Sequence, residues 1–212
     1  MMKVLAINGS PKSDGNTAQA MKLLLQELQA AGIETEMHTI GNKTIRGCIG
    51  CGQCTEKRNG RCNACDDTVN ELIPKMVAAD AMVLGSPTYF AGINGTFKSF
   101  LDRAFFATRA NGEPMRLKFG VAVVAVRRGG GTVTFDQLNK YFQLSEMTIV
   151  GSCYWNIIHG MTPGEIHQDL EGVRTVKTAG RNLAWLLKLA EHGQTAVPKP
   201  EPLEPARTNF VR

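Results

Sequence analysis

Short apolar runs alternate along the chain with stretches in which apolar residues recur every three or four positions. The runs end near polar or turn-forming residues and lack helical spacing, which is typical of strands in a parallel sheet. The one at 33–40 alternates between apolar and polar residues instead. The runs cover about residues 4–7, 33–40, 81–85, 119–126 and 147–154. The pattern therefore predicts five strands.

Helical spacing fills the intervals between these runs. Met21, Leu24, Leu25 and Leu28 fall at i, i+3, i+4 and i+7, and Gly32 follows where a left-handed C-cap belongs. Three further helices are predicted at about residues 94–107, 133–144 and 171–191. Alternating strands and helices without internal repeats predict one doubly wound α/β domain.

One more helix is predicted after residue 67, and it carries a proline. Apolar residues at positions 69, 72, 73, 76 and 77 share one face, and Thr68 with Glu71 can form a capping box. Pro74 predicts a kink or a restart there, because proline removes a backbone donor. Asp66 and Asp67 lead into this helix.

Domain organisation follows from these elements. Residues 1–192 are expected to form the α/β domain, with a cysteine-rich insertion at 47–67. Residues 193–212 contain four prolines and no helical period, and predict a loose tail or an arm on another subunit. In such sheets, ligands bind beyond the carboxyl ends of the strands.

Composition excludes several classes of protein. The chain has 212 residues, of which 43% are hydrophobic and 20% charged, enough to fill a core. The net charge of +5 comes without a block of Lys or Arg, so no nucleic-acid partner is expected. No run approaches the roughly 18 apolar residues of a membrane span. The short apolar run at the start predicts no signal peptide, and a cytoplasmic location is expected.

The loop after the first strand, residues 8–17, is rich in Asn, Gly, Ser and Thr. Hydroxyls, backbone N–H groups and the N-terminus of the next helix suit an anion. The loop lacks both GxxxxGK[ST] and GxGxxG, and no acidic residue ends the second strand to hold a ribose. It therefore predicts a site for one terminal phosphate. An ordinary turn capped by Ser10, Asn16 and Thr17 is the alternative.

Two further loops follow the third and fourth strands. Tyr89 and Phe90 stand where a flat ring could pack against one of them, although both could instead cover the core. Arg127 and Arg128 precede Gly129-Gly130-Gly131, where the backbone can approach a ligand closely. A flexible turn with solvated arginines is the alternative reading of that loop.

Three segments together resemble the flavodoxin-like NADPH-dependent FMN reductase family: GSPKSDGNT, GSPTYFAGING and RRGGG, after strands one, three and four. The resemblance covers about residues 2–190. It implies a five-stranded parallel sheet of order 2-1-3-4-5 with helices on both faces. It also implies a homodimer or homotetramer, in which neighbouring subunits help to enclose the flavin.

The same resemblance implies the residues of the FMN site. The phosphate would be held by Ser10, Lys12, Asn16 and Thr17. The isoalloxazine ring would be bordered by Pro87, Thr88, Tyr89, Phe90, Arg128, Gly129 and Gly130.

Five of the six cysteines lie between positions 48 and 65. Their two-residue spacings can bring sulfurs to one side of a tight turn, which suits thiolates around a metal centre, and clustered thiols favour a reducing cytoplasm. The segment resembles the iron-sulfur flavoprotein branch of the family, which implies a [4Fe–4S] cluster on Cys48, Cys51, Cys54 and Cys62. The last gap, of seven residues, is long for that branch, and Cys65 is additional. Zinc bound to four of the cysteines and free thiols in a surface loop are the alternatives. Cys153 is expected to be a small core residue of the fifth strand.

No catalytic constellation is found, because the four histidines are scattered and no nucleophile elbow occurs. Flavin chemistry needs none, since the flavin accepts hydride itself. We expect an FMN-dependent oxidoreductase that takes hydride from NAD(P)H and passes electrons to a flavin, quinone or other acceptor, with an iron-sulfur cluster as the second redox centre. The alternatives are a non-enzymatic electron carrier with a ferredoxin-like partner, and a zinc-stabilised binding protein with a vestigial flavin site.

Overall fold

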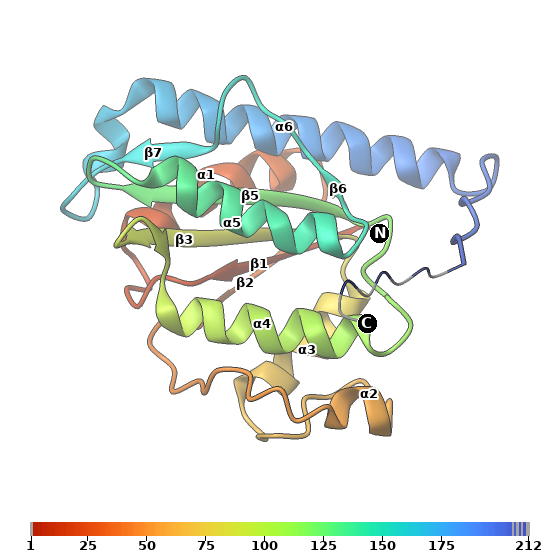
Figure 1. The fold of residues 1–212 in the computed structure, drawn as a ribbon. Helices are drawn as coiled ribbons and strands as arrows, with labels where there is room; N and C mark the ends of the chain where they lie inside the picture. Colours follow the sequence, from red (N-terminus) through yellow and green to blue (C-terminus); the bar gives the residue numbers. More distant parts are fainter. Residues whose placement is uncertain (1, 205, 207, 209, 211–212) are drawn as a thin grey trace.

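A mostly parallel sheet runs through the middle of the protein, with helices on both of its faces (Figure 1). This computed structural model describes residues 2–204, 206, 208 and 210. The strands are β1 (Lys3–Asn8), β2 (Glu34–Thr39), β3 (Ala81–Tyr89), β4 (Gly92–Ile93), β5 (Phe119–Val126), β6 (Thr148–Ile149) and β7 (Ile157–His159). The helices are α1 (Asn16–Ala30), α2 (Gln53–Lys57), α3 (Thr68–Ala78), α4 (Gly95–Arg109), α5 (Gly131–Leu144) and α6 (Leu170–Gly193), with a 3₁₀ turn η1 (Glu165–Gln168).

The order of the strands confirms the predicted fold class. The sheet runs β2-β1-β3-β5-β6, and β7 also pairs with β5 in parallel. This is the order 2-1-3-4-5 once β6 and β7 are counted as two pieces of the fifth strand. The strand order implied by the family resemblance is therefore confirmed.

Two cores lie on the two faces of the sheet. Leu5 and Ile7 of β1 pack into the core beneath α3, α4 and α5, whereas Val4 and Ala6 pack into the core beneath α1 and α6. Successive side chains of a strand point to opposite faces, so a strand buried on both sides is apolar throughout. Because helices cover both faces of the sheet, a ligand can bind at the edge formed by the carboxyl ends of the strands.

The third strand is longer than predicted. It continues through Tyr89 and turns back into β4, with Thr88 opposite Ile93 in an antiparallel pair. The turn residues Phe90 and Ala91 have φ of 49° and 56°, the left-handed values of a two-residue hairpin loop. The polar residues after position 85, which predicted the end of the strand, instead form this hairpin.

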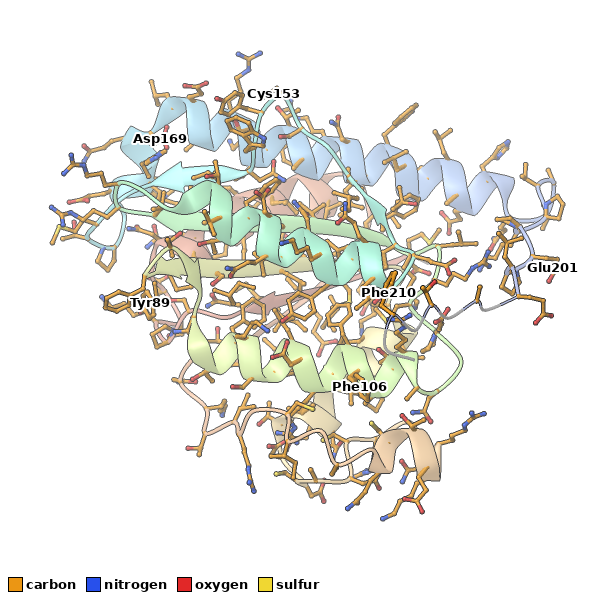
Figure 2. All side chains as sticks on the ribbon, in the orientation of Figure 1. Tyr89, Phe106, Cys153, Asp169, Glu201 and Phe210 are labelled. Atoms are coloured by element: carbon orange, nitrogen blue, oxygen red, sulfur yellow. The ribbon has the colours of Figure 1, made fainter. Side chains whose placement is uncertain are left out.

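The predicted fifth strand at 147–154 is wrong in its bounds. Between residues 147 and 159, only β6 and β7 pair with β5, and the residues between these two short strands leave the sheet. The chain returns at Asn156, whose side-chain amide donates to the carbonyl of Ala122 at 3.0 Å. Cys153 is consequently exposed at the outer edge beside α6, not a core residue as expected (Figure 2). The glycine and polar residues at 151–152 interrupt the apolar run that suggested a continuous strand.

Helix α3 begins as predicted but is capped differently. The carboxylate of Asp67 accepts a hydrogen bond from the backbone N–H of Val69 at 3.1 Å, so Asp67 is the N-cap and the expected Thr68–Glu71 capping box does not form. The helix also runs as one element through Pro74, without the restart considered from the sequence. The cap differs because Asp67, one residue before Thr68, has a short carboxylate that already accepts from a free N–H group of the first turn.

The cysteine-rich insertion lies between β2 and α3, as predicted. It passes along the side of α4 that faces away from the sheet and includes the short helix α2, which the sequence did not predict (Figure 1). Residues 194–204, which follow α6, are all exposed, and the carbonyl of Pro200 accepts from Arg116 at 2.8 Å. Within the described residues, no helix is long and apolar enough to cross a membrane.

Candidate functional site

The chain leaves β1 through two side-chain-to-backbone hydrogen bonds. Buried Asn8 accepts from the backbone N–H of Ser10 at 3.0 Å, and the hydroxyl of Ser10 accepts from the backbone N–H of Lys12 at 3.2 Å. Such local bonds replace the ladder of the strand and fix a turn. The loop is thereby held in a defined shape in front of α1.

The N-terminus of α1 has no side-chain cap. Its N-cap is Gly15, the first turn contains no acidic residue, and the side-chain oxygen of Asn16 instead accepts from the backbone of Gly164 at 2.9 Å. The first N–H groups of a helix have no partner within the helix, and with the helix dipole they attract an anion. This end of α1 therefore fits a phosphate group.

A cleft of about 200 Å³ opens in front of this helix end. It brings together seven residues that the sequence predicted for the FMN site: Ser10, Lys12, Asn16, Thr17, Pro87, Thr88 and Tyr89. Among the described residues that line it, Lys12 and Arg127 are cationic and none is a carboxylate. Positive charge, hydroxyls and free backbone donors on one side, with Tyr89 on the other, suit a ligand with a phosphate and a flat ring.

Four other predicted residues do not line this cleft. Phe90 lies at the tip of the hairpin with its side chain fully exposed. Arg128, Gly129 and Gly130 line a neighbouring cavity of about 400 Å³ instead. The close approach expected of the glycines is present, because a Cβ on Gly130 would lie 2.8 Å from the Cα of Ala91.

Arg127 and the loop at 160–163 also line the cleft, although neither was among the FMN-site residues implied by the resemblance. Ala125 and Arg127 line this cleft, whereas Val126 and Arg128 line the neighbouring cavity, so the alternation of β5 is continued by the two residues that follow its end. That alternation could have selected Arg127 over Arg128. No local signal indicated the 160–163 loop, since it reaches the cleft only because the fifth strand is split.

The neighbouring cavity is bordered by the N-terminus of α6. Asp169 caps this helix by accepting from the backbone of Gly172 at 2.9 Å, and it also accepts from the backbone N–H of His159 at 2.7 Å. Burial would raise the pKa of Asp169, but these hydrogen bonds and the His159 side chain outweigh burial and hold that pKa below its ordinary value. The carboxylate therefore serves as a structural anchor here.

A separate small cavity, of about 20 Å³, lies in the cysteine insertion. Cys48, Cys51, Cys54 and Cys62 all line it, whereas Cys65 is not among its lining residues. Ile49 and Phe106 complete its apolar side, and Figure 2 shows Phe106 on the side of α4 that faces the insertion. Soft thiolates converging from a tight loop are the donor set that iron-sulfur clusters use.

The backbone of this insertion is fastened to the domain by buried polar side chains. Asn70 on α3 accepts from the backbone N–H of Cys62 at 2.8 Å and donates to the carbonyls of Cys62 and Cys65 at 3.0 and 2.9 Å. Across residues 2–204, 206, 208 and 210, no three His, Cys, Asp or Glu side chains stand close enough together to hold one metal ion. The four cysteines thus line one cavity, although within the described residues their side chains are not drawn together as a set of metal ligands.

A doubly wound sheet of this order with an uncapped, hydroxyl-rich phosphate loop defines a flavodoxin-like protein. Residues 2–162 match the model of the NADPH-dependent FMN reductase family, and the chain belongs to this family. The resemblance found in the three loops is therefore confirmed.

Several curated relatives share most of the chain. It is 36% identical over 201 residues to an iron-sulfur flavoprotein of Methanocaldococcus jannaschii, covering 89% of this chain and 98% of the relative. It is 32% identical over 177 residues to an iron-sulfur flavoprotein of Archaeoglobus fulgidus, covering 83% of this chain and 86% of the relative.

Solved structures agree on the fold. A flavodoxin, WrbA-like protein from Agrobacterium tumefaciens matches with a TM-score of 0.61 at 15% identity, covering 89% of this chain and 99% of that one. The Trp repressor binding protein from Bacillus subtilis matches with a TM-score of 0.60 at 20% identity, covering 85% and 98%. These likenesses establish the flavodoxin-like architecture.

Proposed function

We propose that this protein is an FMN-dependent oxidoreductase that takes hydride from NAD(P)H and passes the electrons to a flavin, quinone or other acceptor. The observation that carries the proposal is the cleft at the end of β1, where two cations, hydroxyls and the uncapped end of α1 meet Tyr89. Membership of the NADPH-dependent FMN reductase family supports the same reaction class.

Each part of the cleft has a binding task in this proposal. Ser10, Lys12, Thr17 and the first N–H groups of α1 would hold the phosphate of FMN. Tyr89 and its neighbours on β3 would border the ring, with Arg127 just after the end of the adjacent strand β5. FMN, when bound, supplies the hydride-accepting chemistry, so the protein needs to bind and orient rather than to transfer protons.

Anaerobic reduction tests the proposal. The protein is reconstituted with FMN, freed of excess cofactor, and mixed with NADPH or NADH without oxygen. We expect flavin absorbance to be retained after desalting and then to bleach with one of the two nicotinamides. The proposal of an oxidoreductase would be contradicted if the protein retained no flavin, or if the bound flavin were reduced by neither NADPH nor NADH.

A second candidate function is an electron carrier that exchanges electrons with a ferredoxin-like partner. The shared cavity of Cys48, Cys51, Cys54 and Cys62 at the surface favours it, as do the relatives named iron-sulfur flavoproteins. The four thiolates would hold a [4Fe–4S] cluster, which exchanges one electron at a time. A carrier would keep its flavin oxidised in NAD(P)H, and iron, sulfide and zinc analysis of the same sample would tell a cluster from zinc or free thiols.

The proposal includes an assembly and a location. The rings of Tyr154 and Trp155 pack against each other at an angle of 58°, with centroids 4.5 Å apart, and both residues are at least half exposed beside the 400 Å³ cavity. Exposed aromatic pairs beside a binding cavity are typical of interfaces, and we propose a homodimer or homotetramer. Light scattering after size exclusion measures this. The six free cysteines fit a reducing cytoplasm.

A further inference from the structure

Helix α4 sends one buried cation into the cysteine insertion. Arg103 is 1% exposed, and its side chain is among the largest that are fully buried. Its Nε–H group donates a hydrogen bond to Sγ of Cys62 at 3.2 Å. In the described part of the chain, no other side chain donates to the sulfur of any of the four cavity cysteines.

The rest of the guanidinium is fixed on all sides. Nη1 and Nη2 donate to the two carboxylate oxygens of Asp67 at 2.6 and 3.1 Å, an arrangement of two parallel hydrogen bonds. The carbonyls of Arg46 and Cys65 accept from the same two nitrogens at 3.2 and 3.4 Å. Arg46 and Asp67 flank the two ends of the insertion, so Arg103 ties both ends together and aims Nε at Cys62.

A simple structural role would not require this sulfur contact. A buried cation needs a compensating anion, and Asp67 supplies one. A thiol is a weak acceptor, whereas a thiolate bound to a metal is a strong acceptor for a charged donor. A guanidinium is not deprotonated in proteins. The guanidinium therefore stays charged beside the sulfur.

We propose that Arg103 is a positioning residue that orients Cys62 and raises the reduction potential of the iron-sulfur cluster held by the four cavity cysteines. This inference rests on the cluster of the proposed function. Hydrogen bonds to ligand sulfurs and nearby charge set the potential of such a cluster. A fixed positive charge stabilises the reduced form, because that form carries one more negative charge.

Two substitutions at this position separate charge from hydrogen bonding. Arg103→Gln removes the charge, and Arg103→Lys keeps a charge but cannot present the planar fork to Asp67 and Cys62 together. Arg109→Gln and Arg109→Lys are matched controls on the same helix, since Arg109 is exposed and pairs with Glu113. All variants are made in the full chain and purified without oxygen.

The readout is the midpoint potential of the cluster, followed by electron paramagnetic resonance in a redox titration. We expect Arg103→Gln to disfavour reduction about tenfold, a shift of about 59 mV to lower potential for one electron. Arg103→Lys should shift the potential in the same direction by less, and should alter the spectrum of the reduced cluster. The Arg109 variants should match the wild type in both.

The outcomes are distinguishable from those of the proposed function. Wild-type protein with FMN but without iron and sulfide would refute the cluster and the inference together. A loaded cluster whose potential and spectrum are unchanged in the Arg103 variants would refute the inference alone. If Arg103→Gln fails to fold, Arg103→Lys decides: a shift relative to both Arg109 variants supports positioning, and wild-type values overturn it.

Discussion

Lys12 tests the binding of the phosphate most directly, because it is exposed and can be changed without disturbing the core. Loss of a hydrogen bond to a charged group costs about 1.5–3 kcal/mol, so Lys12→Gln should raise the Kd for FMN about tenfold or more. Riboflavin, which lacks the phosphate, should bind the variant and the wild type equally. Fluorescence titration with both ligands measures this.

Lys22→Gln is the control for that titration. Lys22 also lies on α1 but pairs with Asp14 at the surface, 2.7 Å away, and does not line the cleft. It should leave both affinities unchanged. Equal weakening of FMN and riboflavin by Lys12→Gln would assign Lys12 to the ring or to folding rather than to the phosphate.

Ala91 occupies a backbone conformation that favours glycine. Its φ of 56° in the two-residue hairpin loop costs a residue with a Cβ about 1 kcal/mol or more. We expect Ala91→Gly to stabilise the protein by about 0.5–1 kcal/mol after the entropy of glycine is subtracted. A thermal melt should show a midpoint higher by up to about 4 °C. Ala110→Gly, at φ −66°, should lower it, and equal effects at the two sites would be inconsistent with strain.

Single residues of the site were predictable where the contacts are local. Ser10 and Lys12 lie in the loop after β1, and Thr17 lies in the first turn of α1. The loop between strand and helix is therefore enough to bring all three to the cleft. Phe90 lies outside the cleft because it stands at the tip of the hairpin with β4, a pairing that the turn residues Phe90 and Ala91 do not signal. Arg127 and Arg128 follow the end of β5 and line different cavities, a difference that the RRGGG motif does not signal.

The edge strand β2 carries an ion-pair cluster that links it to β1 and α3. Glu36 accepts from Lys75 of α3, from His38 at 2.6 Å and from Lys3 of β1 at 3.0 Å. These hydrogen bonds lower the pKa of Glu36 from 4.5 to about 2. A carboxylate whose pKa is depressed on folding adds stability above its unfolded pKa and loses it as the pH falls through the folded value.

Glu36→Gln should therefore destabilise the protein near neutral pH by about 1 kcal/mol, the pairs being partly screened by solvent. The difference from the wild type should begin to shrink below about pH 4.5 and be nearly gone at about pH 2. Urea unfolding at several pH values measures it. Glu34→Gln is the control, since Glu34 is more exposed and contacts Lys3 alone in this cluster. A difference independent of pH would contradict the ion-pair origin.

Helices and strands were predictable where one hydrophobic period runs unbroken. α1, α4 and α6 each bury one apolar face, and β1 and β5 contain unbroken runs without charged or polar side chains at 4–7 and 119–126. The predicted bounds of the fifth strand were wrong because residues 150–156 include apolar side chains that lie outside the paired strands. Asn156 brings the chain back through a bond to the carbonyl of Ala122, a contact across 34 positions that a local pattern does not contain.

The protein as a whole consists of a sheet with two helical layers and a third layer, the cysteine insertion, outside α4 (Figure 1). The domain has two large apolar cores, whereas the insertion is held mainly by polar contacts to Arg103, Asn70 and Asn111. Segments with few buried apolar contacts open at lower free energy than a core. The insertion should therefore open without unfolding of the sheet.

Asn70→Ala tests that independence. Asn70 makes three hydrogen bonds to the backbone at Cys62 and Cys65 while most of its surface is buried, so its loss should release the insertion. Trypsin should then cut after Lys57, Arg58 or Arg61 at least about tenfold faster, as expected for a loss of about 1.4 kcal/mol or more in local opening free energy. Asn63→Ala is the control, since Asn63 bonds only within the insertion. If trypsin cuts the insertion faster while the melting temperature of the domain is unchanged, the insertion opens separately. If the melting temperature falls together with the faster cleavage, the insertion and the sheet form one cooperative unit.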